Sequence, residues 1–256
     1  MNDHALAAFF VLAVWWLSTC LVLWMVWLGR AWVRYSVSVF ALLGLVGAVG
    51  LYATSKTETT TSAYLAFASA LAVWGFHELT FLLGIVSGPR KTPCPPEARG
   101  WNRFVYSTLV VIHHEVLLAA TMLAVVTLTW RSPNQVGTWT FFVLWIMRLS
   151  AKLNVFLGVR NLSEQFVPDH LRYMVSYFRR ARMNPLMPVS VVVGGAFAVR
   201  LGTSVVAGDA PQAVLVGQTL VASILMLAVV EHVFLAVPVP DAVLWRWAIR
   251  RRAVLQ

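Results

Sequence analysis

The sequence predicts an all-α integral membrane protein that forms a single seven-helix membrane domain over residues 1–256. The chain is 59% hydrophobic and only 12% charged, whereas soluble domains carry about 25% charged residues. Its mean hydropathy is +0.74. Seven stretches reach the length of about 20 mostly apolar residues that a transmembrane helix needs. These observations place the chain in a lipid bilayer that it crosses several times.

The seven apolar stretches set the expected transmembrane helices. They cover residues 5–28, 36–54, 63–87, 104–130, 138–159, 186–207 and 212–237. The first is too long for a signal peptide and no small-residue cleavage site follows it, so we expect a retained helix. Arg148 and Lys152 interrupt the fifth. Residues 88–96, called the proline strap below, contain four prolines that stop the third helix and stiffen the loop after it.

Lysine and arginine are distributed unevenly between the two ends of these helices. Fifteen basic residues fall on one side, and only Lys56 and Arg131 fall on the other. The fifteen are Arg30, Arg34, Arg90, Lys91, Arg99, Arg103, Arg160, Arg172, Arg179, Arg180, Arg182, Arg246, Arg250, Arg251 and Arg252. The asymmetry predicts a periplasmic N-terminus and a cytoplasmic C-terminus. This topology explains most of the net charge of +10 without nucleic acid as a partner, and the cytoplasmic bases can also attract anionic membrane lipids.

Residues 167–184, on the predicted cytoplasmic side, have an amphipathic pattern. Leu171, Met174, Val175 and Phe178 recur at helical spacing, and the arginines of this segment lie largely elsewhere around the helix. The pattern predicts a cytoplasmic interfacial amphipathic helix. Such a helix is either a connector resting on the membrane or, with the proline strap, a basic docking surface for a partner protein or an acidic pigment tail.

Polar side chains interrupt four apolar stretches at a common depth. The candidate site residues are His77, Glu78, His113, His114, Glu115, Arg148, Lys152, Asn154, Glu231 and His232. At a rise of 1.5 Å per residue, the four helices place these groups roughly 9–14 Å below the cytoplasmic surface. An ionised side chain at the bilayer centre costs roughly 2.5–3.5 kcal/mol. We therefore expect the groups to line one cavity, with Glu115 and His232 as second-rank members because helix geometry turns them aside.

The residue types leave four interpretations of this constellation open. The carboxylates can pair with Arg148 and Lys152 in a buried charge network. Histidine and glutamate can hold a metal ion, although no Glu-x-x-His spacing of a di-iron site occurs. A histidine can ligate the metal of a haem or a bacteriochlorophyll. The polar groups can also form a proton path. The cofactor is therefore a metal ion, a tetrapyrrole or none.

Five strings of the sequence resemble the PuhE family, the photosynthetic complex assembly protein 2 of purple phototrophic bacteria. They are GPRKTPCPP (88–96), MRLSAKLNVFLGVRN (147–161), SEQFVPDHLRY (163–173), SYFRRARMNP (176–185) and VEHVFLAVPVPDAVLWRW (230–247). The resemblance implies a multi-pass protein of the bacterial inner, intracytoplasmic photosynthetic membrane. It implies a role in bacteriochlorophyll supply or in assembly of reaction-centre or light-harvesting complexes. The partners would be the proteins of those complexes or pigment-synthesis enzymes.

Two classes of function remain open. The first is a non-enzymatic assembly factor for the photosynthetic apparatus that handles pigment or a nascent complex. The alternative is a metal-dependent membrane enzyme acting on a pigment or a lipid. An enzyme is the less favoured of the two, because the sequence has no nucleophile elbow, P-loop or dinucleotide fingerprint and the resemblance carries over no catalytic residue.

Overall fold

The computed structural model describes residues 3–162, 164 and 167–237, and that part of the chain is helical apart from its connections. Its α-helices are α1 (Asp3–Trp27), α2 (Val33–Ser55), α3 (Thr60–Leu82), α4 (Gly100–Leu128), α5 (Val136–Leu157), α6 (Leu186–Ala207) and α7 (Gln212–Ala236). All seven are long and apolar enough to cross a membrane. The predicted all-α class and the seven apolar helices are confirmed, whereas the direction of insertion stays a prediction.

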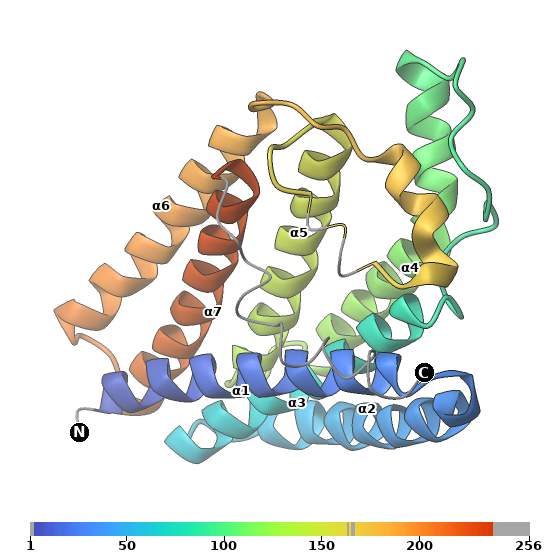
Figure 1. Ribbon diagram of the computed structural model, residues 1–256. Helices are drawn as coiled ribbons and strands as arrows, with labels where there is room; N and C mark the ends of the chain where they lie inside the picture. The colour runs from blue at the N-terminus through green and yellow to red at the C-terminus, as the bar shows by residue number, and fades with distance from the viewer. Residues whose placement is uncertain (1–2, 163, 165–166, 238–256) are drawn as a thin grey trace.

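The helices form two layers that diverge from one end of the molecule (Figure 1). α1, α2 and α3 run side by side in one layer, and α5, α6 and α7 rise away from it. The layers meet where α1 and α7 begin, because Ala7 and Val11 share a buried core with Val216 and Leu220. Toward the later turns of α1 and α7 the layers separate. The resulting wedge opens toward the ends of the helices that the charge pattern assigns to the cytoplasm.

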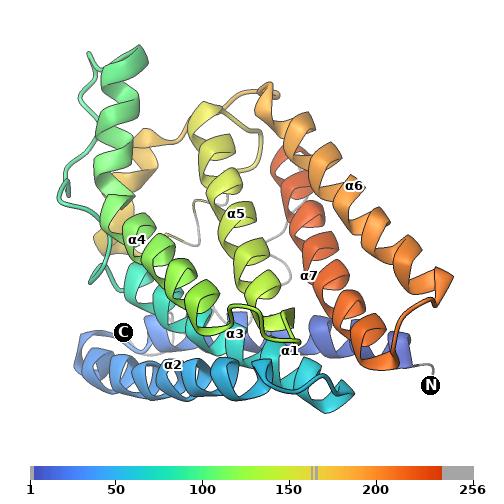
Figure 2. The same ribbon diagram turned by 180° about the vertical axis from the view of Figure 1, so that it is seen from behind.

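α2 and α6 are the outer helices of the two layers (Figure 2). Both expose large apolar side chains, among them Leu42 and Val46 on α2 and Val192 and Phe197 on α6. In water such a surface would be unfavourable, whereas lipid tails are as apolar as these side chains. The two outer faces therefore fit contact with lipid.

The third helix ends earlier than the apolar run predicts. α3 stops at Leu82 and not near residue 87, because Gly84 adopts a left-handed conformation with φ of 71°. The amide of Ile85 donates to the carbonyl of Thr80, and the amide of Gly84 donates to that of Phe81. These two bonds form a Schellman C-cap. The apolar residues that follow belong to the loop toward the proline strap.

The predicted amphipathic segment is a 3-10 helix, η3 (Asp169–Tyr177), shorter than the expected helix. Its buried residues Leu171, Met174 and Tyr177 are spaced by three, which is the repeat of a 3-10 helix. They pack against Phe81 of α3 and Val110 of α4. Protein therefore covers much of the apolar face that the pattern assigned to the membrane surface, and the interfacial position of this segment stays a prediction.

The proline strap lies against η3. The Tyr177 hydroxyl accepts a hydrogen bond from Nε of Arg90 at 2.6 Å and donates to the carbonyl of Thr92 at 3.0 Å. The amide of Cys94 donates to the Ser176 hydroxyl at 2.8 Å. The two segments that the sequence placed on one face therefore form one hydrogen-bonded unit.

Candidate ligand-binding cavity

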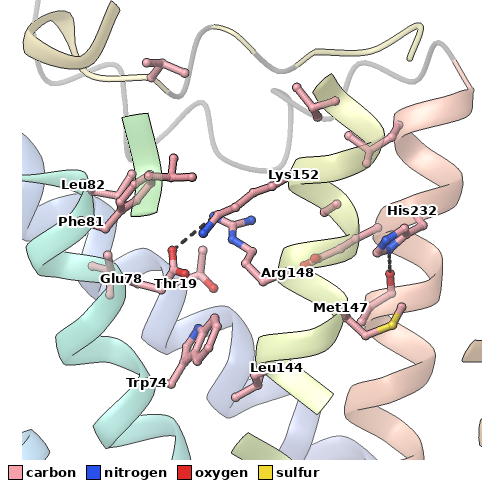
Figure 3. Close-up of a pocket in the computed structure, with 18 of the residues that line it drawn as sticks. Thr19, Trp74, Glu78, Phe81, Leu82, Leu144, Met147, Arg148, Lys152 and His232 are labelled. Atoms are coloured by element: carbon pink, nitrogen blue, oxygen red, sulfur yellow. Dashed lines mark hydrogen bonds and ion pairs between the residues drawn. The ribbon is translucent and has the colours of Figure 1, made fainter. Parts of the chain in front are cut away.

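A cavity of about 660 Å³ occupies the wedge between the two layers. α1, α3, α5 and α7 supply most of its walls, and residues from α4 and from the segment containing η3 complete them. Most lining side chains are apolar, such as Val22, Leu71, Met147 and Ile224. Figure 3 shows charged groups from α3 and α5 that point into the same space. The cavity thus combines apolar walls with a charged region.

Glu78 and Arg148 form an ion pair across the cavity. Nη2 of Arg148 on α5 lies 3.2 Å from Oε2 of Glu78 on α3. The Glu78 side chain is 11% exposed, whereas that of Arg148 is 44% exposed and lines the cavity. A guanidinium has five N–H donors, so Arg148 can still bond to a ligand while it neutralises Glu78.

Lys152 lies one helical turn beyond Arg148 and pairs with a different carboxylate. Its Nζ is 2.6 Å from Oε1 of Glu115 on α4 and 4.9 Å from the centre of the Phe81 ring. Lys152 lines the cavity, and Glu115 holds its ammonium from α4. The i, i+4 spacing puts Arg148 and Lys152 on one face of α5, as the sequence indicates.

A second polar network joins α5, α6 and α7. The Ser150 hydroxyl lies 2.8 Å from that of Ser190 and 3.0 Å from Nε2 of His232, whose Nδ1 donates to the carbonyl of Ala228. Asn154, which is fully buried, donates to Ser190 at 3.1 Å. His232 is the histidine among the described lining residues, and both its ring nitrogens have partners.

Glu231 lines the cavity from α7. It is exposed, and it makes no ion pair with another described residue. Trp15 on α1 is near enough to offer its indole N–H to this carboxylate, and Arg148 is close enough to attract it electrostatically. Of the two described carboxylates that line the cavity, Glu231 is therefore the one without an ion-pair partner.

The three remaining histidines of the candidate set do not line the cavity. Nε2 of His77 is 3.0 Å from the Thr121 hydroxyl. His114 is fully buried beside Phe81, with a ring-centre separation of 4.5 Å, and neither ring nitrogen has a partner among the described residues. His113 is exposed on another face of α4. Adjacent residues of a helix point about 100° apart, so one neighbour turns inward and the other outward.

The structure thus divides the ten candidate residues into three groups. Those that line the cavity are Glu78, Arg148, Lys152, Glu231 and His232. Those outside the lining are His77, His114 and Asn154, which are buried, Glu115, which is partly buried, and His113, which is exposed. Trp15, Thr121 and Ser190 were not predicted from the sequence, because these residue types are common in membrane helices and their spacing gives no signal.

The positions of these side chains support some interpretations of the polar residues better than others. Among the described residues, no group of three or more His, Cys, Asp or Glu side chains could hold a metal ion. Ligation of a tetrapyrrole metal in the cavity would require His232 to give up its bond to Ser150. The ion pairs of Glu78 and Glu115 match the charge-network interpretation, with Glu231 outside those pairs.

The chain belongs to a family described as proteins of unknown function (DUF3623), whose model matches residues 1–256. It is similar to an uncharacterized 30.4 kDa protein in the puhA 5'region of Rhodobacter capsulatus. The two are 38% identical over 251 residues, which are 96% of this chain and 91% of that protein. No solved structure matches the chain. The relationship fits a protein of a photosynthesis gene cluster, whereas membership of the PuhE family in particular stays a prediction.

Proposed function

We propose that this protein is an assembly factor of the bacterial photosynthetic apparatus that holds an apolar membrane molecule, a pigment or a lipid, in its cavity. The observation that carries this proposal is the cavity of about 660 Å³ with apolar walls and a charged region. Ligand sites of about 300–1,000 Å³ typically have such walls with a few polar groups that orient the ligand.

The photosynthetic part of the proposal is supported by the relative from Rhodobacter capsulatus, which is described by its place in the puhA region. A role in reaction-centre or light-harvesting assembly, or in bacteriochlorophyll supply, is consistent with that place. The alternative of a metal-dependent membrane enzyme lacks a three-ligand group among the described residues, so binding is the function we favour.

The test is to delete the gene in a phototroph and to purify the protein from the wild type. We expect the deletion strain to lose absorbance of its assembled complexes. We expect an organic extract of the purified protein to contain a stoichiometric pigment or lipid. Normal complexes in the deletion strain would refute the role in assembly, and an empty extract would refute the carrier role.

We further propose that the protein lies in the inner, intracytoplasmic photosynthetic membrane with its N-terminus in the periplasm. The fifteen-to-two distribution of basic residues supports this direction. A reporter that is active only after export is expected to be inactive when fused after Gln256. An active fusion would reverse the assignment.

The partner of the proposed assembly factor would dock on the basic surface formed by the proline strap, η3 and the residues after η3. Arg179, Arg180 and Arg182 are exposed there. Replacing these three with Gln is expected to weaken recovery of reaction-centre or light-harvesting proteins in pull-downs. The matched control replaces Lys56, Arg131 and Arg200, which removes the same charge at the opposite ends of the helices. Equal recovery from both variants would reduce the segment to a connector.

A further inference from the structure

Among the described residues, the ion pairs around the cavity leave one carboxylate without a cation. Glu78 pairs with Arg148 and Glu115 pairs with Lys152, so two carboxylates neutralise two cations. Glu231 is the third carboxylate and has no ion pair with a described residue. This region of the described structure therefore has an excess of one negative charge when its three carboxylates are ionised.

The neighbouring histidine does not supply the missing positive charge. Nδ1 of His232 faces the carbonyl of Ala228 at 2.8 Å and must donate to it. Nε2 lies 3.0 Å from the Ser150 hydroxyl, which can donate to it. A neutral imidazole satisfies both bonds, so the hydrogen-bonding pattern needs no second proton on the ring.

An ionised carboxylate facing an apolar cavity is costly unless it is neutralised or well hydrogen-bonded. The Trp15 indole gives Glu231 one neutral donor. A ligand that brings a cation with N–H donors would complete the site, because charge-assisted hydrogen bonds are roughly twice as strong as neutral ones. A ligand with a carboxylate head and no cation would add a second negative charge and would leave Glu231 without a counter-charge.

The walls around Glu231 require the rest of the ligand to be apolar. Leu227 and Ile224 precede Glu231 on α7, and Val22 and Leu71 line the cavity from the other layer. The ligand is thus an amphiphile whose head lies at Glu231 and whose chains lie against these residues.

We propose that the cavity binds an amine-headed membrane lipid whose primary ammonium pairs with Glu231. The proposal names the ligand class of the cavity and rests on the carrier part of the proposed function. Arg148 adds a second contact: its guanidinium, 44% exposed, is placed to receive the phosphate of a phosphoethanolamine head group. The ammonium of the zwitterionic head group would then pair with Glu231, and its phosphate would accept hydrogen bonds from Arg148.

Three lipids with identical acyl chains test this proposal on delipidated, purified protein. Phosphatidylethanolamine has a primary ammonium, phosphatidylcholine has a quaternary cation without N–H donors, and phosphatidylglycerol has an anionic head without a cation. Binding is measured by native mass spectrometry and by the rise in Tm. We expect phosphatidylethanolamine to bind about tenfold or more tightly than either other lipid, the equivalent of one charge-assisted hydrogen bond. Equal binding of all three lipids would overturn the proposal.

Glu231→Gln tests the residue itself and keeps its size. We expect this variant to bind the three lipids alike, because it keeps the apolar walls and loses the charge. Glu58→Gln, on the exposed connection between α2 and α3, removes the same charge elsewhere and is expected to keep the preference. Retention of the preference by Glu231→Gln would overturn the assignment of the head group to this residue.

These measurements separate the lipid proposal from the role in photosynthesis. A preference for phosphatidylethanolamine that Glu231→Gln removes would support the lipid site even if the deletion strain assembled normal complexes. Defective complexes in the deletion strain without any head-group preference would overturn the lipid site alone.

Discussion

Arg148 on α5 and Glu78 on α3 are joined at 3.2 Å across the wedge, so one ion pair links the two helical layers where they have begun to separate. Nearer the start of α1 and α7, the layers are held together by apolar packing of residues such as Phe67 and Leu220, and hydrogen bonds also join His4 to Thr219 and Gln212 to Asp3. The ion pair therefore sets the width of the cavity at its charged region, and the same guanidinium lines the space that a ligand would enter.

Removing the Glu78 charge should destabilise the protein more than removing both partners. In Glu78→Gln, Arg148 stays in the wedge without its counter-charge, and breaking a buried pair costs about 3–5 kcal/mol. Because the Arg148 side chain is 44% exposed, we expect a smaller loss, about 2 kcal/mol. Thermal unfolding in detergent measures the difference.

The double variant Glu78→Gln, Arg148→Met is the control for that prediction. It removes both charges and keeps an unbranched apolar chain in place of Arg148, so we expect it to recover much of the lost Tm. A double variant less stable than Glu78→Gln alone would show that Arg148 has a stabilising role apart from this pair.

The number of helices and the common level of the polar groups along them could be predicted from the sequence because both depend on position along the chain. Apolar length gives the seven helices, and a rise of 1.5 Å per residue gives the common level of Glu78, Lys152 and Glu231. Which side of a helix faces the cavity depends on how the helices pack. The sequence therefore could not separate His113, which is exposed, from His114, which is fully buried.

The helix boundaries and the form of η3 show a second limit. The run after Leu82 is as apolar as the helix before it, and only the left-handed turn at Gly84 ends the helix there. In η3, apolar residues spaced by three and by four both occur, so the sequence fits an α-helix as well as a 3-10 helix. Packing of Leu171 and Met174 against α3 and α4 accompanies the tighter form.

Tyr177 should hold the proline strap in place through its hydroxyl. Tyr177→Phe removes the acceptor of Arg90 and the donor to Thr92, a loss of about 1 kcal/mol per hydrogen bond. We expect faster trypsin cleavage after Lys91 in the purified protein. Tyr173→Phe is the matched control, because the Tyr173 hydroxyl is buried without a partner among the described residues. Equal cleavage rates in both variants would contradict the prediction.

The adjacent glycines of α6 should respond differently to alanine. A Cβ at Gly194 would lie 2.9 Å from a methyl group of Val229 on α7, and the β-branched valine has little rotameric freedom to move away. Overpacking of this kind costs about 1–3 kcal/mol. A Cβ at Gly195 meets nothing within 4 Å, so Gly195→Ala should be neutral or should raise the Tm through helix propensity. Similar Tm values for the two variants would show that α6 can shift away from α7.

The two fully buried polar residues Asn154 and His114 should differ in what they contribute to stability. Asn154 donates to Ser190 on α6 and to the carbonyl of Ser150 on its own helix, so Asn154→Leu removes one bond between α5 and α6 and one within α5 and should cost about 1–3 kcal/mol. Neither imidazole nitrogen of His114 has a hydrogen-bond partner among the described residues, and its ring lies 4.5 Å from that of Phe81. His114→Phe keeps a ring there and removes two unsatisfied nitrogens, so we expect an unchanged or higher Tm. A loss as large as that of Asn154→Leu would contradict the prediction, and it would mean either that the larger phenyl ring overpacks this buried site or that water is bound to the imidazole nitrogens.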